Sequence, residues 1–374
     1  MAKQNDLSRC LVTLEQDATV IAVIEMGQSS WLVAGIVPGL ERNPLKKLSP
    51  DPDALLQLLQ RWQKEAVQAG RDGFWLARWL RAREIEAYVI HPSSVPVSRE
   101  HRRAKTDRLD TELLKRAFLG WLRGEPKHCS MAAIPTVADE DTKRPGRERQ
   151  SLVGERTRII NRVKANLARL GIRGFRANLA QASSRLEALR TPEGIAVPAN
   201  TRAELQRDMD RLRFVKQQIK EIETTRAKRL AGAPNEQRHA MVRLLAQVVG
   251  VGIETADMLV QEVFSRNIRD RRALARYAGL TGAPDESGKK RRERGLAKAG
   301  NARVRRGMIE LAWGHLLHQK ASALTEWYRK RTSDTRGGTR KTMIVALARK
   351  LLIALWRLVT TGETPAGLLL RPAV

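Results

Sequence analysis

The chain has 374 residues, which is enough for two or three domains that each bury a core. Its 69 Lys and Arg against 40 Asp and Glu give a formal net charge of +29, far more than solubility requires. This charge indicates a polyanionic partner. A nucleic acid is favoured over a membrane, because no apolar stretch approaches the length of a spanning helix. The N-terminus carries no signal-peptide pattern, so we expect a cytoplasmic protein.

Cysteine and histidine point to no metal centre. Cys10 and Cys129 are the two cysteines and lack metal-ligand spacing, which excludes structural zinc and a disulfide framework. Among six histidines, only His315 and His318 stand at helical spacing. With no carboxylate or cysteine nearby, both are expected to be solvated helix residues rather than ligands.

The first 125 residues alternate strand and helix patterns, which is typical of an α/β domain. The stretch 68–73 between the first two helices is read as a turn with no room for a strand. The expected elements are strands at 19–26, 31–37 and 86–91, and helices at 53–67, 74–83 and 107–122.

Three acids of this region are candidate metal ligands. Glu25 ends an apolar strand, where a carboxylate is costly unless it is paired, binds a metal or emerges into solvent. Asp107 and Asp110 share one face of a helix's first turn, which is also an ordinary capping arrangement. Because Lys105 and Arg108 surround them with positive charge, we expect the acids to hold a divalent metal and the two cations to contact nucleic acid.

The middle of the chain is predicted to be a linker at 126–150 followed by a helical arm at 151–236. Apolar stripes run along helices at 151–170 and 201–230. The near-heptad spacing of the second helix fits a coiled-coil arm or a dimer contact, and an intramolecular helical hairpin explains it equally simply.

Gly250 and Gly252 form an apolar-Gly-apolar-Gly turn that opens a helix. Such a turn exposes backbone N–H groups that can hold a phosphate, as in a helix-hairpin-helix. This turn lies near the start of the last expected domain, 237–374, in which helices are predicted at 301–319 and 341–358, the latter as the core helix.

The most basic stretch, 279–307, is expected to begin with a Gly- and Pro-rich loop that carries Ser287, a candidate hydroxyl nucleophile. A serine before a glycine is more often a turn or capping residue, but the cations on both sides favour a functional role. Polar and basic residues of this stretch expected to contact nucleic acid are Lys289, Lys290, Arg291, Arg292, Lys298, Asn301, Arg303, Arg305 and Arg306.

These motifs, in this order, resemble those of bacterial insertion-sequence transposases of the IS110/IS116/IS902 type, and the resemblance covers almost the whole chain. It implies a RuvC-like (RNase H-like) domain at 1–125 and a mostly helical, serine-bearing domain at 237–374. The matching segments are AVIEM at 22–26, HPSSV at 91–95, AKTDRLD at 104–110, GVGIETA at 250–256, RRALARYAGLTGAPDESG at 271–288 and GLAKAGNARVRRG at 295–307.

The resemblance also implies DNA strand exchange. Ser287 matches the serine that attacks a phosphodiester and holds the DNA end covalently. Glu25, Asp107 and Asp110 match three of the four acids that bind Mg²⁺ or Mn²⁺. The family further implies a structured guide RNA encoded by the element, a homodimer or homotetramer, and association with the bacterial nucleoid.

Two positions depart from the family pattern. The first acid, usually aspartate, is Glu25 here. The position of the second acid, at the end of a strand, is Gln68, and the strand itself is expected to be missing near 68–72. These departures predict a copy that is impaired as a recombinase but still binds DNA. A metal-dependent RuvC-type nuclease and a catalytically silent nucleic-acid-binding protein are the alternatives, and a covalent serine–DNA adduct would distinguish the recombinase from both.

Overall fold

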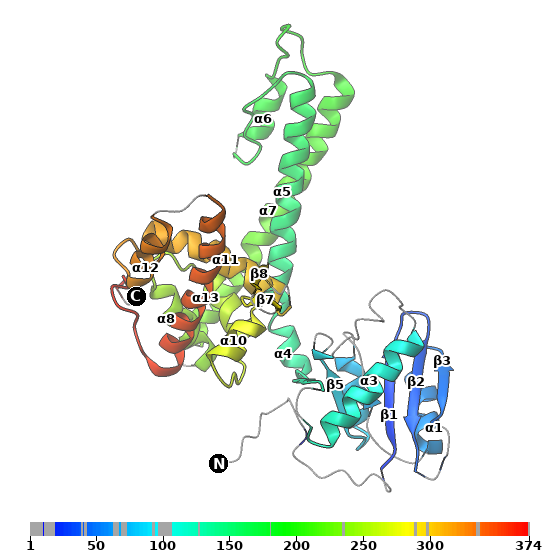
Figure 1. Cartoon of the computed structure of the whole chain (residues 1–374). Coiled ribbons are helices and arrows are strands. Elements are labelled where there is room, and N and C mark those ends of the chain that lie inside the picture. The colour runs from blue at the N-terminus through cyan, green and yellow to red at the C-terminus, as the bar shows by residue number, and fades with distance from the viewer. Residues whose placement is uncertain are drawn as a thin grey trace. The chain divides into compact units, whose positions relative to one another are not determined.

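The structure is a computed structural model of the whole chain (Figure 1). The described residues are 10, 19–38, 40, 43–62, 67–68, 73–91, 94–95, 107–125, 128–179, 181–233, 236–287, 290–296, 299–333 and 337–372, of which 67–68, 107–108, 283–287, 290–294 and 337–339 are described by their backbone alone. The chain forms two compact units, Met1–Glu140 and Asp141–Val374. Within the described residues, no helix is long and apolar enough to cross a membrane.

The first unit is built on a six-stranded mixed sheet with the order β3-β2-β1-β4-β5-β6. Strand β1 pairs antiparallel with β2 and parallel with β4, and β4 in turn pairs parallel with β5. The edge strands β3 and β6 are antiparallel to their neighbours. The strands are β1 (Ile21–Met26), β2 (Trp31–Ile36), β3 (Leu45–Leu48), β4 (Val67–Gln68), β5 (Ala87–Ile90) and β6 (Met131–Ala132).

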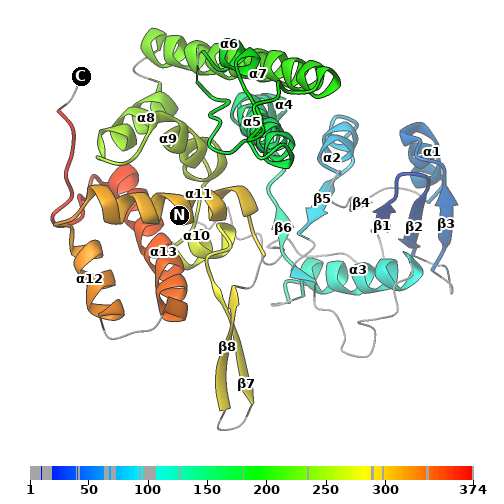
Figure 2. The ribbon, with the colours of Figure 1, turned by 90° about the horizontal axis from the view of Figure 1, so that it is seen from above.

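Helices cover both faces of this sheet, as Figure 2 shows. Because successive strand residues point to opposite faces, Ala22 and Ile24 of β1 pack with α1 (Pro52–Trp62) and α2 (Phe74–Arg81). Ile21 and Val23 pack with α3 (Asp107–Leu122) on the other face. The alternation places Glu25 on the α3 face of β1.

The expectation of a missing strand near 68–72 was wrong at position 68, and residues 69–72 lie outside the described residues. Val67 and Gln68 form β4, which lies between β1 and β5 and pairs with both. A strand of two residues shows no alternation that a sequence pattern could reveal. Its hydrogen bonds to two neighbouring strands, rather than its own composition, define it. The sheet is therefore continuous across this position.

The second unit begins with a helical arm, in which α5 (Arg144–Arg169) and α7 (Ala199–Gly232) lie side by side with the short α6 (Ala182–Glu187) near their far end (Figure 1). Apolar residues of both long helices, including Val163, Leu167, Leu205 and Leu212, share one core. The heptad-like stripe of α7 is thus buried within the chain, as the helical-hairpin alternative predicts.

Residues 126–150 were predicted to be a linker, and this was wrong for most of the segment. Within it lie β6, the short α4 (Val137–Asp141) and the first turns of α5. Pro145 is compatible with this helix because it occupies the first turn, where its missing N–H has no partner to lose. The Pro, Gly and charge in the segment therefore mark a helix start rather than a flexible connection.

The remainder of the second unit is a helical body that carries one two-stranded hairpin. Buried Leu347, Leu351 and Leu355 run through α13 (Gly337–Thr361), which confirms it as a core helix. The other elements of the body are α8 (Gln237–Gln247), α9 (Ile253–Leu259), the π-helical turn η2 (Val260–Phe264), α10 (Arg271–Tyr277), β7 (Gly282–Ser287), β8 (Lys290–Leu296), α11 (Ala302–His318) and α12 (Ala323–Thr332).

Candidate functional site

The acid at the end of β1 is held by the helix that carries the other two candidate acids. Thr111 Oγ1 of α3 donates a hydrogen bond of 3.2 Å to Glu25 Oε2. Thr111 is fully buried, whereas Glu25 is half-buried. Thr111 follows Asp110 directly and lies one turn beyond Asp107. The contact therefore fixes Glu25 beside the first turn of α3.

Asp107 and Asp110 stand where the sequence placed them, in the first turn of α3, which spans the predicted residues 107–122. Asp110 is half-buried. The side chains of Asp107 and Arg108 lie outside the description, as does Lys105. Among the described side chains, no three of His, Cys, Asp and Glu gather in a metal-binding group. The metal site remains a prediction that rests on Glu25, Asp110 and the position of Asp107.

Gln68 occupies a defined position in the sheet. The parallel register pairs Gln68 with Val23, two residues before Glu25 on the neighbouring strand. On the other side Gln68 pairs with Tyr88 of β5. Position 68 is thus a strand end next to the strand of the first acid, and this chain has an amide there instead of a carboxylate.

Ser287 is the last residue of β7, so the loop predicted around it is a strand instead. Strands β7 and β8 form an antiparallel hairpin that extends away from α10 (Figure 2). Ser287 pairs with Lys290 at the closed end of that hairpin. A loop was expected here because the stretch contains Gly and Pro. A strand that pairs on one side only can nevertheless contain Pro. The side chains of Ser287, Lys290, Arg291 and Arg292, and all of Lys289 and Lys298, lie outside the described residues.

Two glycines close the base of this hairpin. Gly279 and Gly300 have φ of +65° and +82°, a region that favours glycine. A Cβ on Gly300 would lie 2.5 Å from the carbonyl oxygens of Arg276 and Tyr277. The backbone N–H of Asn301 donates to the Tyr277 carbonyl at 2.7 Å across the same junction. These contacts fix the backbone at the place where the hairpin joins the helical body.

Two of the residues predicted to contact nucleic acid, Asn301 and Arg303, make contacts within the second unit, and their role toward nucleic acid stays a prediction. Asn301 caps α11, where its Oδ1 accepts from Arg303 N at 3.0 Å and Val304 N at 3.2 Å. Its Nδ2 donates to Glu262 Oε2 at 3.2 Å. Arg303 Nη1 donates to Glu262 Oε1 at 3.2 Å, and its Nη2 donates to the Gly146 carbonyl at 2.6 Å. The helix start near Asn301 is confirmed.

Glu262 is the centre of this network, and it was not predicted from the sequence. Its side chain is 2% exposed, and Arg147 of α5 binds it through Nε at 2.9 Å and Nη2 at 3.1 Å. Burial by itself raises the pKa of this carboxyl, but hydrogen bonds from Arg147 and Asn301 and the charge of Arg303 bring the pKa below its ordinary value. A lone acid in the apolar run 258–264 is the signal that could have revealed it.

A second charged network joins both arm helices to α9. Arg226 of α7 binds Glu254, and its Nε lies 3.1 Å from Asp257 Oδ2. Arg149 of α5 lies 3.0 Å from Glu254 and also binds Glu223. Both networks are formed by residues far apart in the sequence, so the base of the arm is held to the body by ion pairs on two sides.

The predicted phosphate-binding turn lies between α8 and α9. Gly250 has φ of +93°, and Gly252 is the residue before α9. The Val249 N–H donates to the Leu369 carbonyl at 3.1 Å, so part of the turn backbone is occupied inside the body. Glu254 adds negative charge to the first turn of α9, which weakens the attraction of this helix N-terminus for a phosphate. Phosphate binding here remains a prediction.

Arg305 and Arg306 are the predicted contacts of α11 that stay accessible. Arg306 is exposed, and Arg305 is half-buried with its Nη1 on the Ala299 carbonyl at 3.0 Å. His315, on the same helix, was predicted to be solvated, and this was wrong. It is 3% exposed, and its Nε2 lies 2.8 Å from Ser322 Oγ, which caps α12. Burial lowers the pKa of His315 to about 4.

Comparisons with known proteins agree with these motifs. The model of the family described as "Transposase IS116/IS110/IS902 family" matches residues 242–329, which run from α8 into α12. A protein of Sinorhizobium fredii (strain NBRC 101917 / NGR234) named "Putative transposase y4rJ" is 38% identical over 376 residues, with 94% of each chain covered. Because this similarity extends along nearly the whole length of both chains, the chain belongs to the IS116/IS110/IS902 family of transposases.

Proposed function

We propose that this protein is a DNA recombinase that moves an insertion sequence by strand exchange through a covalent bond between Ser287 and DNA. The observation that carries the proposal is the hydrogen bond from Thr111 to Glu25. It joins a strand-end acid to the helix turn that holds Asp107 and Asp110, and a carboxylate metal site needs its acids near one another. Family membership supports the DNA substrate.

The proposed fold of the first unit is RNase H-like. Support comes from the parallel strands β1, β4 and β5, which continue an antiparallel β1–β2 pair in one sheet. The candidate acids lie at the end of β1 and at the start of α3. For the second unit we propose a helix-hairpin-helix role for α8, α9 and the turn at Gly250 and Gly252.

The donor set suits a hard divalent cation, since Mg²⁺ and Mn²⁺ prefer carboxylate oxygens. Glu25, Asp107 and Asp110 would hold it, and when bound it supplies positive charge that stabilises the charge developing on a phosphate. Thr111 keeps the Glu25 carboxylate at the turn. An amide at Gln68 leaves one ligand position neutral, which weakens the site without removing it.

Ser287 acts as the nucleophile in this proposal. Its Oγ forms a bond to phosphorus as the bond from phosphorus to one deoxyribose oxygen breaks, and the serine proton passes to the released hydroxyl. A hydroxyl of another DNA end then reverses the reaction, so that rejoining needs no ATP. The hairpin carries Ser287 beyond the helical body, which supports access to a DNA strand. We also propose that the protein binds a structured guide RNA and acts as a homo-oligomer.

Denaturing electrophoresis of the protein with labelled element ends, the element's RNA and Mg²⁺ tests this function. We expect a labelled protein–DNA adduct with the native chain and with Ser333→Ala, a serine of the same unit outside the hairpin. Ser287→Ala should give no adduct. Free cleaved ends without an adduct would instead indicate a metal-dependent nuclease that uses water.

A catalytically silent nucleic-acid-binding protein is the second candidate, and the amide at Gln68 is the observation that favours it. This candidate predicts steeply salt-dependent binding and neither adduct nor cleavage with Mg²⁺ or Mn²⁺. The same gel, read beside a binding titration, separates the two candidates.

A further inference from the structure

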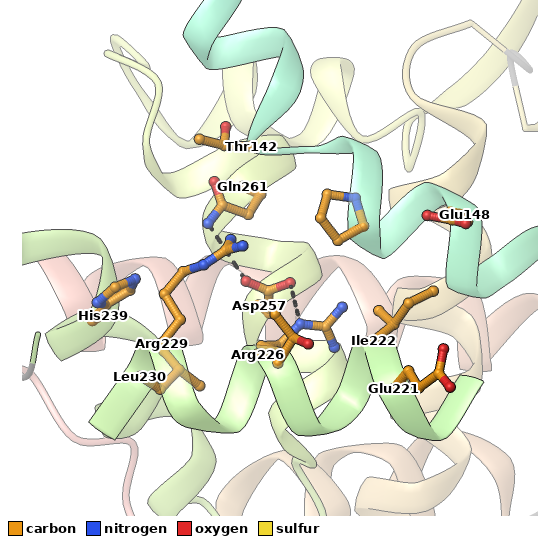
Figure 3. Close-up of a pocket in the computed structure, with 12 residues that line it drawn as sticks. Thr142, Glu148, Glu221, Ile222, Arg226, Arg229, Leu230, His239, Asp257 and Gln261 are labelled. Atoms are coloured by element: carbon orange, nitrogen blue, oxygen red, sulfur yellow. Dashed lines mark hydrogen bonds and ion pairs between the residues drawn. The ribbon is translucent and has the colours of Figure 1, made fainter. Parts of the chain in front are cut away.

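A pocket of about 220 Å³ lies at the foot of the arm, where α5, α7, α8, α9 and η2 meet (Figure 3). All of its lining residues belong to the second unit, and none of them lies in the hairpin of Ser287. A single water needs roughly 10–15 Å³ of such volume, so one bridging water would leave most of the pocket unfilled. The pocket has room for a molecule of several ring atoms.

Two polar atoms on the lining are buried and have no partner in the described structure. One is Nη2 of Arg226, a residue that is 6% exposed. Its other guanidinium nitrogens bind Glu254 and Asp257. The second is Oε1 of Gln261, whose Nε2 donates to Asp257 Oδ1 at 3.4 Å. Since a buried polar atom without a partner is costly, the pair indicates a ligand that offers both an acceptor and a donor.

The charges around the pocket argue against a phosphate as that ligand. Arg226 and Arg229 contribute two positive charges, whereas Glu148, Glu221 and Asp257 contribute three negative ones. With His239 neutral the lining sums to −1, in a chain whose net charge is +29. A lining of net negative charge does not attract an anion, so it favours an uncharged ligand.

The remaining walls suit a flat ring. Pro145, Ile222 and Leu230 give the pocket an apolar side. Arg229 is exposed, and within the described residues no hydrogen bond or ion pair engages its guanidinium. A free guanidinium plane at the edge of an apolar pocket is one of the surfaces on which unpaired nucleobases stack.

We propose that this pocket receives an unpaired nucleobase of the nucleic acid that the protein binds. The inference rests on the proposed nucleic-acid-binding function and adds to it a site that reads an extrahelical base. A ring nitrogen or carbonyl of the base accepts from Arg226 Nη2, and an amino or imino group donates to Gln261 Oε1. Arg229 covers one face of the ring, and the phosphates stay outside.

The test uses the full chain and matched hairpins of RNA and of DNA. Each hairpin carries a one-nucleotide bulge, with each of the four bases in turn, and is compared with the same hairpin carrying an abasic bulge. A fully paired hairpin measures binding that does not depend on the pocket. For at least one base we expect the intact bulge to bind about tenfold more tightly than the abasic bulge, as stacking and two hydrogen bonds predict.

Three variants make the result specific. Gln261→Met keeps the side chain's length and removes the acceptor, and Arg229→Ala removes the stacking plane from an exposed position where misfolding is not expected. Both should bring the ratio of abasic to intact Kd close to one. Lys228→Ala, an exposed neighbour on α7 outside the pocket, is the charge-matched control and should keep the native ratio.

A ratio near one in the native chain for every base in both nucleic acids would overturn the proposal and leave water as the occupant. The proposal would also be overturned if both Gln261→Met and Arg229→Ala kept the native ratio of abasic to intact Kd. A ratio seen only with RNA, or only with DNA, supports the proposal and identifies which strand supplies the base. Absence of salt-dependent binding to the fully paired hairpin is a different failure, because it contradicts the proposed function itself.

Discussion

Arg147 and Glu262, which are 115 residues apart in the chain, form a two-point ion pair between α5 of the arm and the π-helical turn η2 of the body, with N–O distances of 2.9 and 3.1 Å. Arg303 and Asn301 approach the same carboxylate from the start of α11. One buried acid thus fixes the positions of three elements, and α11 is also the helix that follows the hairpin of Ser287. The foot of the arm and the base of that hairpin are parts of one framework.

Replacing Glu262 with Gln should lower the free energy of unfolding of the second unit by about 3 kcal/mol, because it leaves the half-buried Arg303 without its countercharge. Urea unfolding measures the loss. Hydrogen exchange should show faster exchange at the start of α5 and of α11. Glu310→Gln, at an exposed position of α11, is the control and should change stability by less than about 0.5 kcal/mol. Equal effects of the two changes would contradict the central role of Glu262.

Glu262 also predicts how this framework responds to acid. Its pKa in the folded protein lies below the ordinary value of 4.5, so its ionised form is favoured by folding. The contribution is present above the unfolded pKa and is lost as the pH falls through the folded value. The Glu262→Gln variant should therefore approach the stability of the native chain below about pH 4.5 and differ most near neutrality.

His315 should make the body less stable in mild acid. Its pKa is about 4 when folded and 6.5 in an unfolded chain, so between these values the unfolded state binds more protons. The stability is complete above pH 6.5 and declines as the pH falls toward 4, by at most about 3 kcal/mol. Unfolding curves between pH 4 and 7 measure this slope. His315→Gln, which retains a donor for Ser322, should flatten it, and an unchanged slope would assign the effect to other groups.

In the arm, Asp208 is fully buried and accepts from Arg162 at 2.8 and 2.5 Å and from Arg211 at 3.0 Å. Hydrogen bonds from Arg162 lower the pKa of Asp208 despite burial. Arg162→Leu should destabilise the arm by about 2 kcal/mol, because Arg211 alone then faces the buried charge. The matched change Arg213→Leu breaks an exposed pair with Asp210 and should cost less than about 1 kcal/mol. Thermal unfolding of both variants checks the difference, which would vanish if Arg162 did not stabilise the buried charge of Asp208.

Two of the three arginines of α11, Arg303 and Arg306, should behave differently toward DNA. Arg306 is exposed, so Arg306→Gln should reduce the slope of log K against log salt by about one, as for the loss of one phosphate contact. Arg303 is engaged by Glu262 and Gly146, so Arg303→Gln should lower stability and leave the salt slope nearly unchanged. Filter binding over a range of salt concentrations measures both slopes. A reduced slope in Arg303→Gln would return this residue to the set of direct contacts.

Elements that local sequence defines were predictable. Helix α3 spans the predicted residues 107–122, and α11 begins where a helix was predicted, near Asn301. Both predictions depend on apolar spacing, which is a local property of the sequence. The second helix of the arm and the core helix α13 were predictable for the same reason.

Features that depend on distant partners were not predictable. Strand β4 exists because β1 and β5 supply its hydrogen bonds, and Glu262 is buried because three residues from α5 and α11 surround it. Residues of β7 have a composition that favours a loop, but they form a strand because they pair with β8. Of the candidate site, the sequence located Glu25, Asp110 and Ser287 but not Thr111, since a threonine inside a helix carries no signal of the acid it will contact.

Because the sheet is continuous, a single substitution at position 68 tests whether the missing carboxylate limits activity. Because β4 is present and pairs Gln68 with Val23 of β1, the departure from the family pattern is confined to one side chain. Gln68→Glu should therefore raise the yield of the Ser287–DNA adduct at limiting Mg²⁺, by roughly tenfold, as restored metal ligation of this kind predicts. No strand needs to be rebuilt. A titration of Mg²⁺ and of Mn²⁺ against adduct yield measures the change.

Gln57→Glu, on helix α1 away from the acids, is the control for added negative charge and should leave the titration unchanged. Combining Gln68→Glu with Thr111→Val should lose part of the gain, because Glu25 is then no longer held beside α3. A Gln68→Glu variant with the native metal dependence would mean that position 68 does not contribute to the metal site. The amide would then be a neutral replacement, and the cause of any impairment of this copy would lie elsewhere, with the longer side chain at Glu25 as the next candidate.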